Sequence, residues 1–392
     1  MALTTDDKVI LSSFIIVFSA FTTIYITQPI LPAIGRNFEA SPFQSSLSVS
    51  LVLAGITLGS IPSGILSEKY PISYLVYVGS ALLILCDVIC AFTPNLFVLV
   101  TSRFLQGFLI PFLTSAIAAS LSKTVREGNI VRGIAWYVTA TILGGMCGRV
   151  IGGVANSVDY WQASFLFSGS LILFSCLYIR HLVPESRYCK SDEKNRVTYC
   201  EIFLERKIWV SLVCAFFGQG IFSAVFNTLP FRLDSSQYNL SSDIISAIYC
   251  VYIVGLIVGP LAGYFTVNFG SRRTLSAGTV ILFISIWILK GQDLFLIIIG
   301  LGGVCIGFFT IHTTATAMLN RQIDRGLGQA NSLYMIFYYL GAFCGSIWAI
   351  LLFELTGWNT VMHISLCLTL VLLMAGRCGK PPTRQIDSRL LD

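Results

Sequence analysis

Residues 144–153 read Gly144-Gly145-Met146-Cys147-Gly148-Arg149-Val150-Ile151-Gly152-Gly153 and lie within a long apolar stretch. A similar run, Gly341-Ala342-Phe343-Cys344-Gly345, occurs 197 residues later, again within an apolar stretch. Trp161 and Trp358 are separated by the same 197 residues. Small residues spaced four apart let helix backbones approach each other closely in lipid. The repetition therefore predicts two homologous halves, each with a close helix–helix contact at its glycine row.

The composition of the chain explains why these stretches are expected in a membrane. Of the 392 residues, 55% are hydrophobic and 11% are charged, whereas a soluble domain carries about 25% charged residues. So little charge cannot cover a water-facing surface, and the bilayer is the alternative solvent. The net charge of +6 comes from basic residues at the ends of apolar runs, which argues against a nucleic-acid partner. The expected fold class is an all-α membrane protein.

Twelve apolar runs are long enough to cross a bilayer, because a helix of about 20 residues spans its hydrocarbon core. The expected spans are residues 10–31, 45–66, 72–92, 95–119, 132–155, 163–182, 208–230, 243–266, 273–290, 293–318, 328–352 and 358–376.

The basic residues predict the orientation of these spans. Of 25 Lys and Arg residues, 20 fall on the side that holds both termini. Arg36, Arg232 and Lys290 fall on the other side, and Arg103 and Arg149 lie within spans. By the positive-inside rule, we expect both termini to be cytoplasmic.

Two more repeated pairs support a division into halves. Gly64 and Gly263 are 199 residues apart, and Pro29 and Pro230 are 201 residues apart. We therefore expect a six-helix bundle at 1–183, a cytoplasmic linker at 184–207, a second six-helix bundle at 208–376 and a cytoplasmic tail at 377–392.

Several motifs resemble those of the major facilitator superfamily. Gly64-Ile65-Leu66-Ser67-Glu68-Lys69-Tyr70 resembles the loop signature after span 2 of that family, and Phe269-Gly270-Ser271-Arg272-Arg273 repeats its end in the second half. Arg103-Phe104-Leu105-Gln106-Gly107 is similar to the Arg-x-x-Gln-Gly element of span 4. Residues 144–153 look like the span 5 motif of exporting members, with Arg149 where proline is usual. Two longer stretches, 226–233 and 328–334, are similar to a bacterial branch labelled as drug or sugar efflux permeases.

This resemblance implies a major facilitator fold with 12 transmembrane helices and transport by alternating access. We expect a monomer in a bacterial inner membrane that exports a small organic solute by antiport with protons. The expected partners are the lipid bilayer, the small-molecule substrate and protons, with no cofactor and no metal. The alternatives are an importer or exchanger of a small organic anion or sugar and, more remotely, a channel or structural membrane protein. Enzyme motifs such as His-Glu-x-x-His or a glycine-rich nucleotide loop do not occur, so no enzymatic activity is expected.

Three charges inside expected spans are candidates for coupling or substrate binding, since an unpartnered charge in the membrane is costly. Helix geometry places Asp87, Arg103 and Arg149 in one layer of the first half. They could form a structural clamp, or they could bind protons or a substrate anion. The resemblance links Arg103 to proton coupling. The span at 10–31 lacks the acidic residue common in proton-coupled relatives, and two cations against one carboxylate would instead suit an anionic substrate.

His312 is a further titratable candidate, because an ordinary histidine has a pKa of about 6.5. A lone histidine among threonines is often only a satisfied hydrogen bond between helices. Polar and aromatic stripes predict a central cavity, with the alternative that they hold helices together. The expected lining residues are Tyr25, Gln28, Gln106, Gln219, Asn227, Asn331, Tyr334 and Tyr338. The residues expected to act in gating or helix packing are Gly64, Glu68, Gly107, Gly144, Gly148, Gly152, Gly270, Arg272 and Arg273.

Overall fold

The computed structural model describes residues 4–67, 69–179, 198–323 and 325–378, and every regular element in those ranges is a helix. The prediction of an all-α chain is therefore confirmed for this part. Ten of the helical segments are long and apolar enough to cross a membrane, and a shorter apolar helix covers Ala163–Tyr178. The helix α12 (Ser271–Ile288) carries Arg272 and Arg273 in its first turn. Together with α12, these helices correspond to the twelve expected spans.

The first half contains α1 (Thr5–Tyr25), the 3-10 turn η1 (Gln28–Ile30), α2 (Leu31–Asn37), α3 (Pro42–Ser67), α4 (Ile72–Phe92), α5 (Leu96–Thr124), α6 (Glu127–Ser157) and α7 (Ala163–Ile179). The second half contains α9 (Trp209–Asp234), α10 (Ser242–Tyr249), η4 (Cys250–Ile253), α11 (Val254–Phe269), α12 (Ser271–Ile288), α13 (Leu294–Gln322), α14 (Leu327–Thr356) and α15 (Trp358–Cys378).

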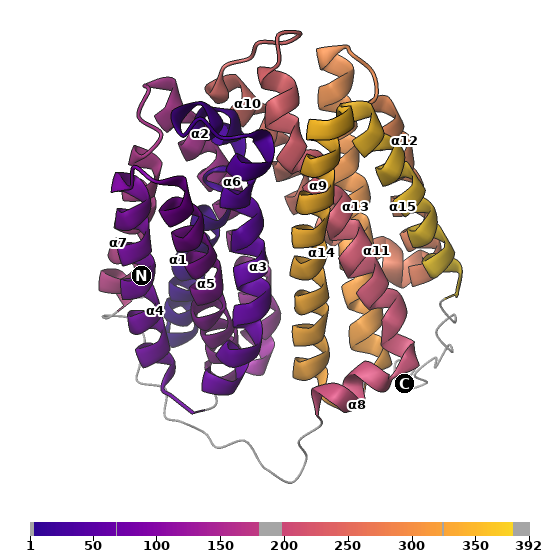
Figure 1. Cartoon of the computed structure of the whole chain (residues 1–392). Coiled ribbons are helices and arrows are strands. Elements are labelled where there is room, and N and C mark those ends of the chain that lie inside the picture. The colour runs from indigo at the N-terminus through magenta and orange to yellow at the C-terminus, as the bar shows by residue number, and fades with distance from the viewer. Residues whose placement is uncertain (1–3, 68, 180–197, 324, 379–392) are drawn as a thin grey trace.

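Helices of the same half pack together, so that α1–α7 and α9–α15 form two bundles side by side (Figure 1). The bundles meet where α3 packs on α14 and where α6 packs on α10 and η4. Ile142 of the first bundle joins the hydrophobic core of the second, and Tyr339 and Ala342 of the second join that of the first. The interface is therefore formed by packed side chains from both bundles.

The two glycine rows occupy equivalent places in the two bundles. A Cβ atom on Gly148 would overlap the carbonyl oxygen of Thr22, because α6 lies directly on the backbone of α1. A Cβ atom on Gly345 would overlap the carbonyl oxygen of Gly220 on α9 in the same way. The repeat therefore encodes one close crossing in each bundle, α1 with α6 and α9 with α14.

The first and eighth expected spans are broken, whereas the sequence prediction treated each as continuous. The first changes from α1 to η1 and then to α2 around Pro29 and Pro32. Proline has no N–H group to donate, so it cannot continue the hydrogen-bond ladder of the helix. The eighth passes from α10 through η4 into α11 without a proline at the break.

The helix α8 (Tyr199–Leu204) lies within the expected linker and was not predicted. Its N-cap is Thr198, whose Oγ1 accepts from Glu201 N at 3.3 Å and donates to Glu201 Oε1 at 2.8 Å. The Thr-x-x-Glu spacing was the available signal. The linker residues 184–197 and the tail residues 379–392 lie outside the described part of the chain.

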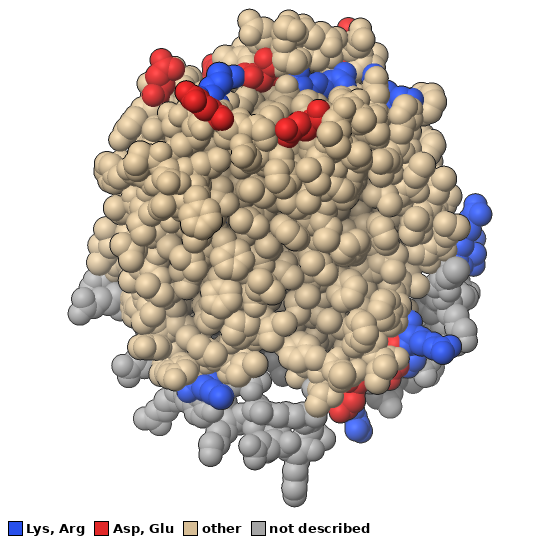
Figure 2. Space-filling view, in the orientation of Figure 1, with Lys and Arg blue, Asp and Glu red and all other residues tan. Residues whose placement is uncertain are grey.

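Charged side chains gather at the two ends of the visible face in Figure 2, and a broad belt across most of that face carries none. Exposed apolar side chains such as Phe97, Phe295 and Leu355 face outward. This distribution suits a protein whose middle contacts hydrocarbon and whose ends contact water.

Candidate functional site

Arg103 on α5 is fully buried and bonded to backbone carbonyls of neighbouring helices. Its Nε donates to Ser48 O at 2.9 Å, its Nη1 to Thr23 O at 2.8 Å and its Nη2 to Ile24 O at 2.7 Å. Thr23 and Ile24 belong to the last turn of α1, where helix carbonyls have no partner in their own helix. Arg103 therefore caps α1, and its charge also interacts favourably with the helix dipole there.

Asp87 is connected to Arg103 through Gln106. Arg103 Nη1 donates to Gln106 Oε1 at 2.6 Å, and Gln106 Nε2 donates to Asp87 Oδ1 at 2.8 Å. Asp87 is fully buried, and its Oδ2 has no hydrogen-bond partner. The carboxyl group forms no direct ion pair with any described residue. Gln106, expected to line a cavity, instead lies inside the first bundle as a bridge between two candidate residues.

Arg149 on α6 lies in a different cluster, so the expected single network of Asp87, Arg103 and Arg149 is wrong on this point. Its Nε donates to Gln28 Oε1 at 2.7 Å, and its Nη1 donates to Gly145 O at 2.9 Å. Its Nη2 is buried without a hydrogen-bond partner. The prediction used only the depth of each charge along its helix, which gave one layer. Depth does not determine which face of a helix a residue occupies.

Three tyrosine rings surround the guanidinium of Arg149. The guanidinium carbon lies 4.1 Å from the ring centre of Tyr25, 4.7 Å from that of Tyr252 and 5.5 Å from that of Tyr249. Tyr25 comes from the first bundle, and the other two come from the second. The cation is therefore held at the boundary of the bundles by contacts with aromatic faces. Tyr249 and Tyr252 were missed; their signal was an i, i+3 spacing with Ser246 on one helix face.

A chain of hydrogen bonds crosses the boundary from the same arginine. Gln28 Nε2 donates to Asn227 Oδ1, and Asn227 Nδ2 donates to Ser346 Oγ. The chain therefore runs from Arg149 through Gln28 and Asn227 to Ser346. Arg149 and Ser346 are 197 residues apart, which is the offset of the internal repeat. Two equivalent positions are thus joined through the polar side chains of the helices between them.

His312 on α13 lies in an aromatic cluster of the second bundle. Its Nδ1 is 2.9 Å from the hydroxyl of Tyr334, and its ring centre is 5.0 Å from that of Tyr338 and 5.9 Å from that of Phe308. Phe308 in turn packs against Phe222, which packs against Tyr252. A continuous set of aromatic contacts therefore links His312 to the surroundings of Arg149.

The remaining expected lining residues have different surroundings. Gln219 is buried, and its Oε1 has no hydrogen-bond partner. Asn331 donates to Asn320 Oδ1 and to Leu327 O, both at 2.9 Å, near the start of α14. Asn331 therefore joins α13 to α14 near their ends rather than joining the cluster around Arg149.

The motif residues lie at helix contacts and helix ends. Gly107 of α5 packs on the backbone of Val52, and Gly144 packs on the backbone of α1 as Gly148 does. Gly152 packs on the carbonyl of Ile26, directly after α1. Gly64 approaches the hydroxyl of Tyr199 on α8. Gly270 has a φ of 88° at the start of α12, and Arg272 and Arg273 after it are exposed. Glu68 lies outside the described residues.

The bundles are also joined at the end that carries α2 and the start of α10. Arg36 and Asp234 form an ion pair at 2.7 Å. Glu354 accepts from Phe43 N at 3.0 Å, and Asn156 Nδ2 donates to Ser242 Oγ at 2.8 Å. Within the described part, every hydrogen bond between the bundles lies at the level of Gln28 or nearer this end. Sequence reasoning missed these contacts, because each partner alone is an ordinary loop or helix-end residue.

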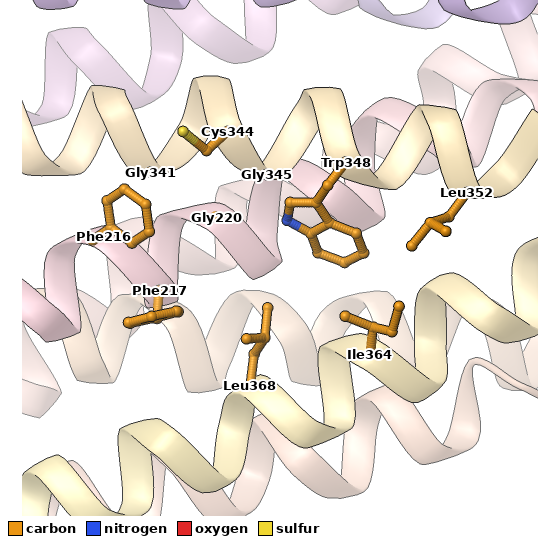
Figure 3. A pocket seen from close by; sticks show the side chains of 10 residues that line it. All are labelled: Phe216, Phe217, Gly220, Gly341, Cys344, Gly345, Trp348, Leu352, Ile364 and Leu368. Atoms are coloured by element: carbon orange, nitrogen blue, oxygen red, sulfur yellow. The ribbon is translucent and has the colours of Figure 1, made fainter.

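An apolar pocket of about 370 Å³ lies among α9, α14 and α15 (Figure 3). Its walls include Phe216, Phe217, Trp348 and Leu368, and the close crossing at Gly220, Gly341 and Gly345. None of the candidate charged residues lines it, so it is separate from the cluster around Arg149.

Comparison with known proteins identifies the family of the chain. The family model described as Major Facilitator Superfamily matches residues 13–258 and 235–388. The inner membrane transport protein YnfM of Escherichia coli (strain K12) is 26% identical over 375 residues, covering 94% of this chain and 90% of that protein. An uncharacterized transporter of Buchnera aphidicola subsp. Schizaphis graminum is 27% identical over 343 residues, covering 86% of this chain and 82% of the relative.

Solved structures support the same fold. A bacterial homolog of the human lysosomal transporter Spinster, in an inward-facing and unoccupied conformation, superimposes with a TM-score of 0.77 at 12% identity, covering 96% of this chain and 98% of the other. A variant of the nucleoside transporter NupG gives a TM-score of 0.76 at 12% identity, covering 95% and 99%. The predicted major facilitator fold is confirmed, and the relatives are transporters rather than enzymes. This chain is a multi-pass membrane transporter that belongs to the major facilitator superfamily.

Proposed function

We propose that the chain exports a small organic solute carrying at most one negative charge, in exchange for protons. The observation that carries the proposal is the guanidinium of Arg149, which is fully buried between the bundles with one nitrogen lacking a hydrogen-bond partner. A buried cationic donor without a partner costs free energy. An anionic or strongly polar group of a solute would supply the missing hydrogen bond.

The surroundings of Arg149 suggest the shape of the solute. Tyr25, Tyr249 and Tyr252 present ring faces, and Gln28 and Asn227 present amides. Ring faces suit an apolar or aromatic body, while one arginine balances one negative charge. A multiply charged solute would find a single compensating cation in this cluster.

Alternating access would proceed by rocking of the two bundles, residues 1–183 and 208–376, about this cluster. The contacts of Arg36 with Asp234 and of Asn156 with Ser242 close one end. By the positive-inside rule, that end faces away from the cytoplasm. We therefore assign the present state as closed outward, in a monomer within a bacterial inner membrane with both termini cytoplasmic.

Asp87 is our candidate for the proton carrier. Its Oδ2 has no partner, so that oxygen can accept a proton without losing a hydrogen bond. Protonation would change the bond from Gln106, which also holds Arg103 at the capped end of α1. Since Tyr25 and Gln28 follow directly on that end, a change at Asp87 could be transmitted to the solute cluster. His312, which lies in the second bundle, is the second candidate.

Export is favoured by the similarity of residues 144–153 to the span 5 motif of exporting members. An importer or exchanger of a small organic anion is the second candidate, and the positive charge of Arg149 is the observation in its favour.

Solute binding can be tested by thermal unfolding of the purified chain with sulfonates and carboxylates, each paired with its neutral amide, such as benzenesulfonate with benzenesulfonamide. We expect acids to raise the melting temperature and amides not to. Arg149→Met should abolish the shift, whereas Arg132→Met, an exposed position on the same helix, should preserve it. Equal shifts in wild type and Arg149→Met would refute the assignment.

Coupling can be tested in proteoliposomes with benzenesulfonate, which stays charged and does not leak. Antiport predicts faster uptake when the interior is acidic, and symport predicts the reverse. We expect Asp87→Asn to keep solute exchange and to lose the response to the pH gradient. An unchanged response would remove Asp87 as the proton carrier, and conductance without saturation would indicate a channel.

A further inference from the structure

A polar pocket of about 320 Å³ lies at the end of the second bundle, away from the cluster around Arg149. It is formed by the ends of α9 and α14, the connection between α12 and α13, and the start of α15. The polar side chains that line it are Arg232, Ser235, Gln237, Lys290, Gln292, Thr356 and Asn359. The transport mechanism proposed above uses none of them.

Arg232 is held in this pocket with donors to spare. Its side chain is more than nine-tenths buried, its Nη2 donates to the Tyr238 hydroxyl and to Gly291 O, and its guanidinium lies 4.6 Å from the ring centre of Trp358. Its Nε is buried without a hydrogen-bond partner. A fixed cation with an unused buried donor is a site that favours an anionic acceptor.

Lys290 supplies a second cation, and its Nζ lies 4.3 Å from the ring centre of Trp287. None of the described residues that line the pocket is acidic. The three carboxylates next to lining residues have other partners: Asp234 pairs with Arg36, Asp293 accepts from Leu296 N, and Glu354 accepts from Phe43 N. The charges of Arg232 and Lys290 are therefore not neutralised by the residues that line the pocket.

We propose that this pocket binds a phosphate group. Arginine and lysine together with amide and hydroxyl donors form the set that recognises phosphate oxygens. The rings of Trp287 and Trp358 lie at the same end, and tryptophan is enriched at the level of lipid headgroups. The group could belong to a phospholipid headgroup or to free phosphate, and both share the chemistry that the pocket offers.

The test uses the purified full chain in detergent with phosphatidylglycerol, measured by native mass spectrometry, and with inorganic phosphate, measured by isothermal titration calorimetry. We expect Lys290→Gln and Arg232→Gln each to weaken binding at least about tenfold, since a hydrogen bond to a charged group is lost. Arg36→Gln combined with Asp234→Asn is the matched control, because it removes a cation at the same end outside the pocket without leaving an unpaired carboxylate beside it.

The two arms identify the source of the phosphate group. Binding of lipid alone, lost in Lys290→Gln and kept in the double control variant, assigns a headgroup site. Binding of both ligands with the same dependence assigns a general phosphate site. Lys290→Gln keeps the inference testable if Arg232→Gln does not fold. Absence of binding in both arms, or binding that is equal in wild type and Lys290→Gln, would overturn it.

Discussion

Arg103 and Arg149 are both fully buried arginines of the first bundle, yet their surroundings differ. Every nitrogen of the Arg103 guanidinium donates a hydrogen bond, and all its acceptors belong to the first bundle. Arg149 leaves one nitrogen without a partner, and its neighbours come from both bundles. The difference separates two uses of a buried charge. The bonds of Arg103 stabilise its own bundle, whereas Arg149 has the unused donor that our proposed solute would bind.

Removal of Arg103 should have the largest effect. Arg103→Met leaves the carbonyls of Thr23 and Ile24 at the end of α1 without the donor that caps them. We expect the free energy of unfolding to fall by at least ~3 kcal/mol. Thermal unfolding in detergent is the measurement, with Arg149→Met as the comparison variant and little change expected there. Equal losses of stability in the two variants would erase the distinction between the arginines.

A substitution of Gly153 on α6 should have an effect of intermediate size. It tests whether the cluster around Arg149 depends on contact between the two bundles. A Cβ atom there would overlap Ser246 and crowd Ser242 O on α10, so Gly153→Ala should push the bundles apart at the closed end. Overpacking costs about 1–3 kcal/mol, which we expect to shift the population toward the outward-open state about tenfold or more.

This shift can be measured as the distance distribution between spin labels at Val158 and Ile244, in a chain whose exposed cysteines have been replaced. Gly263→Ala is the control, because nothing lies within 4 Å of a Cβ atom at that position. Because Gly153 does not contact Arg103, Gly153→Ala should leave the hydrogen bonds of Arg103 within the first bundle unchanged. Identical distributions for both glycine variants would show that the contact of α6 with α10 does not hold this end closed.

Removal of the ion pair between Arg36 and Asp234 should have the smallest effect. The Arg36 side chain is 61% exposed, and exposed ion pairs contribute at most about 1 kcal/mol. We expect Arg36→Ala to shift the same label distances slightly in the direction of Gly153→Ala. Arg36→Asp combined with Asp234→Arg should restore the wild-type distribution. A shift by Arg36→Ala larger than that of Gly153→Ala would reverse the order of importance at this end.

The spans and the two close helix crossings could be predicted because hydropathy and glycine spacing are local properties of the chain. Gly144 and Gly341 mark the same crossing in both bundles, as their offset indicated. The break after Tyr25 was foreseeable from Pro29 and Pro32, yet apolar length alone gave a continuous span.

The candidate site could be predicted only in part. Depth brought Arg103 and Arg149 to one layer, but a helix has several faces, and the rotation of α6 placed Arg149 against α10 and η4 instead of α5. The tyrosines around it lie at least 100 positions away in the chain. No pattern within one span encodes such a contact, since it depends on how the two bundles are placed against each other.

The hydrogen-bonded chain from Arg149 to Ser346 has a consequence for how a solute sits. Identical residues at these two equivalent positions would give a site with two chemically equal ends, and a solute could bind in either of two orientations. Arginine at one end and serine at the other give the site a single electropositive pole. A solute with one charged end would then enter, cross and leave in a single orientation.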